Sequence, residues 1–179
     1  HLKEHGQAEY LAQAQAYLKE NNVPLPGEAK MTGCPGSRAM TFEKKDSAKT
    51  APAGSQPSQL THWPIQMHLI SPNAPHFQGA DLLLAADCTA YALGDFHKEH
   101  LKGKKLVIAC PKLDEGQDVY VEKIKALIDD AKINSLTVMI MQVPCCGGLL
   151  RLAQKAADQA TRKIPIKSLV VGLQGQIVT

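Results

Sequence analysis

The sequence predicts an α/β protein: a mostly parallel sheet of about four to five strands with helices on both faces. An N-terminal helix and a long Pro/Gly-rich connector precede this sheet. Two observations predict the fold class. Short, continuous apolar runs alternate with longer segments of helical periodicity. The chain of 179 residues, with 44% hydrophobic and 21% charged residues, is large enough to bury one core.

The chain before residue 61 is expected to have two parts. Residues 7–22 predict a helix, with an apolar stripe of Leu11, Ala14 and Leu18 at helical spacing. We therefore assign 1–22 to a helix and expect it to be the tail of a module that precedes His1. Residues 23–60 are rich in Pro, Gly, Ser and Lys, which indicates an extended or poorly ordered connector.

Residues 61–179 form the predicted α/β domain. An alternating stretch and four apolar runs predict strands, and the segments between them have apolar residues on one helical face. Gly94 is a weak point in the first of these helices. The expected strands are 63–70, 81–87, 104–110, 135–143 and 168–175, the last turning into a short hairpin, and the expected helices are 89–101, 118–131 and 148–163.

Composition excludes several classes of function. Aromatic residues make up 4% of the chain, too few for a platform that stacks single-stranded nucleic acid. The net charge of +3 comes from scattered basic residues, so we expect no nucleic-acid partner. No apolar run approaches about 18 residues, so we expect no membrane span. Five cysteines without a secretion signal indicate a reducing, cytoplasmic setting.

Cysteines follow three successive predicted strands, and these are the candidate metal ligands. Cys88 follows the first apolar run, Cys110 ends the second, and Cys145 and Cys146 follow the third. The carboxyl edge of a parallel sheet is where such proteins bind ligands, so neighbouring strands would bring these thiols together. The helices that begin there are expected to lower the thiol pKa values. The alternative is that the thiols are ordinary buried side chains.

Other residues are weaker candidates for the same site. Gly147 and Gly148 allow close approach of the backbone, and their N–H groups could bond to a cofactor's sulfur. Cys34 on the connector and His97 on the predicted helix are possible further ligands. Two carboxylates, Asp87 and Asp114, lie beside strand-end cysteines and could orient ligands, act as acid or base, or cap helices. Tyr91 is expected to pack rather than to take part in chemistry.

Several sequence words resemble a family of ferredoxin-like proteins of anaerobic bacteria and archaea. They are "SQLTHWPIQ", "NAPHF", "AADCTAYALGDFH", "ACPKLD" and "VPCCGG", and they follow the "GCPGS" of the connector. In that family a ferredoxin module with two [4Fe–4S] clusters precedes an α/β cysteine domain. The resemblance implies that residues 1–22 are the tail of such a module and that this module is a redox partner.

A partial resemblance connects the chain to the CCG cysteine domains of heterodisulfide-reductase-like proteins. There, a cysteine, a spacer and Cys-Cys-Gly help to hold an iron–sulfur cluster. Here 34 residues separate Cys110 from Cys145. The later CxxC of those domains is missing, and we expect Cys88 to supply that ligand.

Four functions remain open at this point. The first is an iron–sulfur electron-transfer protein, an oxidoreductase component that passes electrons to a redox partner. The second is a zinc site of lyase, hydrolase or structural type, with water or His97 completing the ligand set. The third is metal-free thiol redox chemistry, for example between Cys110 and Cys145. The fourth is a domain that only docks partners.

Overall fold

The computed structural model describes residues 12–13, 16–17, 20, 39–42 and 56–178. The chain divides into two compact units, His1–Pro35 and Gly36–Thr179. In the first unit every described residue is helical, which agrees with the helix predicted over 7–22. The rest of that helix and most of the predicted connector lie outside the described residues.

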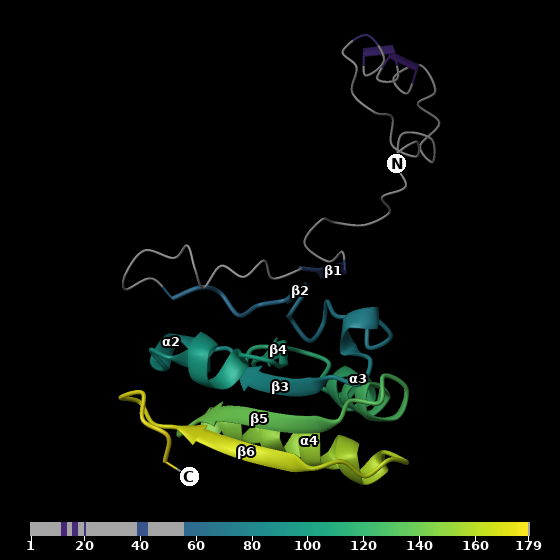
Figure 1. The fold of residues 1–179 in the computed structure, drawn as a ribbon. Helices are drawn as coiled ribbons and strands as arrows, with labels where there is room; N and C mark the ends of the chain where they lie inside the picture. The colour runs from purple at the N-terminus through teal and green to yellow at the C-terminus, as the bar shows by residue number, and fades with distance from the viewer. Residues whose placement is uncertain (1–11, 14–15, 18–19, 21–38, 43–55, 179) are drawn as a thin grey trace. The chain divides into compact units, whose positions relative to one another are not determined.

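A four-stranded, fully parallel sheet forms the centre of the second unit (Figure 1). Its order is β4-β3-β5-β6, and every neighbouring pair is parallel. This confirms the predicted fold class. The apolar runs form strands because both faces of the sheet are covered. In the two central strands every side chain after the first residue is buried. The strands are β3 (Asp81–Ala86), β4 (Lys105–Ala109), β5 (Ser135–Met141) and β6 (Ile166–Val171).

Two regular α-helices, α3 (Asp118–Asp129) and α4 (Gly147–Gln159), connect β4 to β5 and β5 to β6. The connection from β3 to β4 is less regular. It was expected to be one helix over 89–101, but it consists of α2 (Thr89–Ala92) and a π-helical segment, η4 (Phe96–Leu101). The break includes Gly94, the weak point of the sequence pattern. Short 3₁₀ turns form η3 (Pro75–Phe77) and η5 (Pro144–Cys146).

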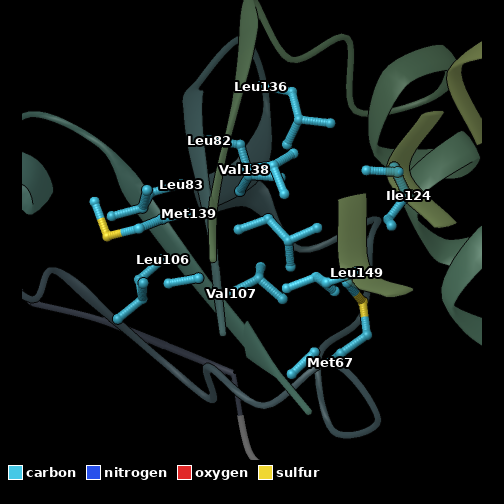
Figure 2. Close-up of a cluster of buried hydrophobic side chains, with 14 of the residues drawn as sticks. Met67, Leu82, Leu83, Leu106, Val107, Ile124, Leu136, Val138, Met139 and Leu149 are labelled. Atoms are coloured by element: carbon cyan, nitrogen blue, oxygen red, sulfur yellow. The ribbon is translucent and has the colours of Figure 1, made fainter. Parts of the chain in front are cut away.

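The core lies on both faces of the sheet (Figure 2). On one face, Leu82 of β3 and Val138 of β5 point toward Ile124 of α3 and Leu149 of α4, and all four side chains are fully buried. Leu83, Leu106 and Met139 lie on the other face. Successive side chains of a strand point to opposite faces, so Leu83 lies opposite to Leu82 and Met139 opposite to Val138. The sheet is therefore the middle layer between two covering layers.

The prediction of a strand over 63–70 is wrong except at Trp63. Only β2 (His62–Trp63) is a strand, and it pairs antiparallel with β1 (Met40–Thr41) inside the predicted connector. After a single bridge between Gln66 and Ile108, the chain turns. The Lys123 ammonium donates to the carbonyls of Met67, His68 and Ile70, at 2.8–2.9 Å. The Lys123 side chain therefore satisfies carbonyl groups that would pair with a neighbouring strand if this segment were a strand.

The end of the chain forms the expected hairpin. After β6 the chain turns through 172–175, and Ile177 bridges antiparallel to Val171. Gly175 has φ +84°, and a Cβ atom there would collide with the carbonyl oxygen of Ala92. Glycine is therefore required where the hairpin passes the end of α2. Within the described part of the chain, no helix combines the length and apolar character needed to span a membrane.

Candidate functional site

The strand order brings all four strand-end cysteines to one edge of the sheet. β3 lies between β4 and β5, and the register pairs Ala86 with Ala109 and Ala85 with Met139. Cys88 therefore follows the central strand of the three, and Cys110 follows its neighbour β4. The third strand, β5, is followed by η5, which contains Cys145 and Cys146. Figure 1 shows these strands running in the same direction toward this edge.

The chain leaves β3 and β5 on opposite faces of the sheet. Helices α3 and α4 pack against each other on the face that Ile124 and Leu149 cover. The segments α2 and η4 line a cavity with Leu106, which lies on the other face. In a parallel sheet such a change of face opens a crevice outside the carboxyl ends of the two strands. Cys88 follows β3 at this point of the sheet, and Cys145 and Cys146 follow β5.

Gly148 brings the segment after β5 into contact with the segment after β4. A Cβ atom built on Gly148 would lie 3.4 Å from Cβ of Pro111, the residue next to Cys110. The added atom would be in ordinary van der Waals contact with Pro111, so the two segments lie next to each other here. The glycine pair was expected to permit close approach of the backbone, and at Gly148 the close neighbour is Pro111. The segments that bear Cys110 and Cys146 consequently meet above the end of β3.

The four thiols differ in exposure. Cys88 and Cys145 are exposed, Cys110 is half-buried and Cys146 is buried. Burial raises the pKa of Cys146, and the neighbouring Cys145 and Cys88 add to this rise, against a hydrogen bond with the Met141 backbone. The expectation of a lowered pKa is therefore wrong for Cys146, because loss of solvent outweighs the helix terminus. The same interactions show that Cys88, Cys145 and Cys146 form one electrostatic group.

Cys110 belongs to a neighbouring polar cluster. Its backbone N–H donates to Oδ2 of Asp114 at 2.9 Å, and the hydroxyl of Tyr120 donates to the same oxygen. Asp114 thus fixes the loop after β4, and it caps no helix, since Gln117 precedes α3. Burial raises the pKa of Tyr120, and its bond to Asp114 raises it further. Burial also raises the pKa of Asp87, with a contribution from the Asp114 charge.

Tyr120 is a site residue that the sequence analysis missed. It begins the buried face of α3, and its hydroxyl partner lies six residues upstream in an irregular loop. No periodic pattern connects these two positions, so only the folded loop shows the contact. Tyr91, in contrast, was expected to pack, but its side chain is 94% exposed. Tyr91 lies on α2, three residues after Cys88, and this four-residue helix does not bury its side chain.

His97, a further predicted ligand, is not grouped with these thiols. His97 is exposed on η4, and its Nδ1 accepts a hydrogen bond from the Gln59 backbone N–H at 3.0 Å. Cys34 lies outside the described residues. Across residues 56–178 and the few described before them, no three or more His, Cys, Asp or Glu side chains are arranged to hold a metal ion.

The fold agrees with a comparison against protein families. Residues 74–179 match a family described as a Rossmann-like domain. The chain belongs to this family. The family's description identifies the fold and includes neither a cysteine motif nor a cluster, so the resemblance to ferredoxin-linked proteins is supported only as far as the α/β fold.

A search of curated proteins found a relative of this chain. It is an uncharacterized protein of Archaeoglobus fulgidus, which is 28% identical over 121 residues. The match covers 66% of this chain and 83% of the relative. No solved structure matches the chain.

Proposed function

We propose that this Rossmann-like domain is an iron–sulfur electron-transfer domain. Its ligands would be the strand-end cysteines Cys88, Cys110, Cys145 and Cys146. The observation that carries the proposal is the convergence of three adjacent strand ends, which Gly148 tightens by packing against Pro111. Core packing alone does not require a thiol at each of these ends.

The donor set fits such a group. Iron–sulfur clusters commonly take four cysteine thiolates, and this edge of the sheet offers four. The side chains as they lie do not form a ready-made metal site. However, Cys88 and Cys145 are exposed and can change rotamer at little cost, which would turn them toward Cys146. The backbone N–H groups of Gly147 and Gly148 could then bond to sulfur.

The cluster would allow this domain to accept an electron from one redox protein and to pass it to another. When bound, it supplies one-electron chemistry, and the protein holds it at an edge that a partner can reach. The partner would be a separate redox protein or a ferredoxin module attached before His1, in a cytoplasmic, reducing setting.

A zinc site is the second candidate, and the Asp87–Asp114 pair favours it. These two carboxyl groups interact beside Cys110. Zinc accepts thiolate ligands, and a nearby carboxyl group can act as acid or base in lyase or hydrolase chemistry. The ligand set would then be three of the cysteines with water.

The test is a metal and sulfide count on the chain purified without oxygen, together with its visible spectrum. The expected result is a brown protein whose iron and acid-labile sulfide are lost in Cys145→Ser and Cys146→Ser. Cys34→Ser is the matched control, and it should keep its iron. A colourless protein with one zinc per chain would select the second candidate. A metal-free protein would contradict both and leave thiol redox chemistry, which a titration of reactive thiols would then test.

A further inference from the structure

A cavity of about 190 Å³ lies on the sheet face that α2 and η4 cover. Apolar side chains of Leu60, Ile65, Phe96 and Leu106 line it, together with four residues that bear polar groups, namely Asp87, Thr89, Tyr91 and His97. Apolar walls with a few placed polar groups are typical of small-molecule sites. The volume suits a small ligand rather than a nucleotide, and the proposed metal site does not use this cavity.

Asp87 lines this cavity and has an unsatisfied acceptor atom. Its Oδ1 atom is shielded from solvent and has no hydrogen-bond partner within the part of the chain that the structure describes. Leaving a buried acceptor unpaired is unfavourable, so such atoms usually receive a donor from a ligand or water.

His97 contributes another polar group. The Gln59 backbone N–H donates to its Nδ1, so Nε2 is the ring nitrogen that is left to donate to a ligand. Thr89 and Tyr91 add hydroxyl groups, and the Thr89 hydroxyl already donates to the Ala86 carbonyl. Among the described residues that line the cavity, Asp87 is the one acidic side chain, and none is Lys or Arg. A positively charged ligand matches this arrangement better than an anion does.

We propose that this cavity binds a small organic ammonium ion with an apolar body. The ammonium group donates to Oδ1 of Asp87, and the body packs against Leu60, Phe96 and Leu106. Binding requires no metal, so this inference is independent of the proposed function. Because Cys88 follows Asp87 directly, the bound molecule would lie beside the thiol edge.

The test is a titration of the full chain, followed by amide NMR shifts, with three probes that share one ring. Benzylamine is cationic, benzyl alcohol is neutral and benzoate is anionic. Benzylamine is expected to saturate, with shifts at Ala90 and His97, and to bind about tenfold tighter than benzyl alcohol. Benzoate is expected not to bind. Failure of benzylamine to saturate, or equal binding of all three probes, would overturn the proposal.

Two variants and a control locate the binding. Asp87→Asn removes the charge and should weaken benzylamine binding by about tenfold or more. Ala90→Leu places a larger side chain at the wall of the cavity and should abolish binding while leaving Asp87 intact. Asp95→Asn changes a nearby aspartate that does not line this cavity, and it should bind normally. Wild-type binding in Asp87→Asn and Ala90→Leu, with both folded by circular dichroism, would refute the site.

Discussion

At the scale of single residues, Lys123 is the clearest stabilising contact outside the core. Its ammonium donates to three backbone carbonyls of the turn that replaces the expected strand. Lys123→Met keeps the length of the side chain and removes all three donors. We expect it to lower the free energy of unfolding by about 2 kcal/mol, since bonds to a charged donor contribute more than neutral ones. Urea denaturation measures this loss.

Lys125 provides the control for that experiment. It lies on the same helix, and its Nζ is 3.6 Å from Oδ2 of Asp129, four residues further along, in a pair whose lysine is 44% exposed. Helix pairs of this spacing that solvent can reach contribute about 0.5 kcal/mol or less. Lys125→Met should therefore leave stability nearly unchanged. An equal loss in both variants would show that the three carbonyl bonds are not the cause.

The same scale shows what the sequence reveals about the candidate site. The cysteine positions were predictable, because a thiol after each apolar run can be read directly from the chain. Their environments were not. Cys146 has a raised pKa because it is buried, and burial depends on packing that the spacing does not contain. The contact of Tyr120 with Asp114 depends on a loop conformation, so no local pattern indicates it.

At the scale of elements, the start of α4 tolerates a larger residue at one glycine. Gly147 has helical φ and ψ angles of −58° and −21°, and an added Cβ atom meets only Arg151 Nη1, at 3.5 Å. Alanine favours helix over glycine, so Gly147→Ala should raise the free energy of unfolding by about 0.5 kcal/mol. Chemical denaturation of the two proteins side by side measures the change.

Gly103 is the contrasting position, between η4 and β4. It also has open space around it, but its φ is +79°, a conformation that alanine adopts only with strain. Gly103→Ala should therefore destabilise the protein by about 1 kcal/mol. Stabilisation by both substitutions would mean that backbone conformation does not control these sites.

Strands and helices differed in how well they could be predicted. The buried parallel strands were predictable because a strand that is covered on both faces has a continuous apolar sequence. The segment over 63–70 alternates like a strand, yet a lysine from α3 satisfies its carbonyls and lets it turn. Such a long-range contact is invisible in a local window. The interrupted helix over 89–101 was signalled in part by Gly94.

At the scale of the whole molecule, the strand order determines whether the strand-end cysteines lie close together. The alternation of elements predicted a parallel sheet, but the sequence does not state which strands are neighbours. The order β4-β3-β5-β6 places the strand before Cys88 between the other two cysteine-bearing strands. A different order with the same elements would separate the thiols by additional strand spacings of about 4.8 Å each.

Stability of the whole molecule should depend on pH through His62. This residue is fully buried on β2, and its Nε2 lies 3.0 Å from the Leu106 carbonyl of β4. Its ring centroid is 4.4 Å from that of His76. Burial, together with the charge that His76 can carry, lowers the pKa of His62 from 6.5 to about 4. The bond to the Leu106 carbonyl favours the protonated ring, but burial outweighs it, so protonation of His62 is unfavourable in the folded protein.

The direction of the effect follows from this lowered pKa. Above pH 6.5 the ring is neutral in both states, and the full stability is present. Between pH 6.5 and about 4 the unfolded chain binds a proton that the folded chain does not, so stability falls as the pH falls. The slope from this residue is at most about 1.4 kcal/mol per pH unit. His62→Gln retains an N–H donor for Leu106 and cannot titrate, so urea denaturation should show a shallower loss over this range. An unchanged slope in His62→Gln would assign the acid sensitivity to other groups.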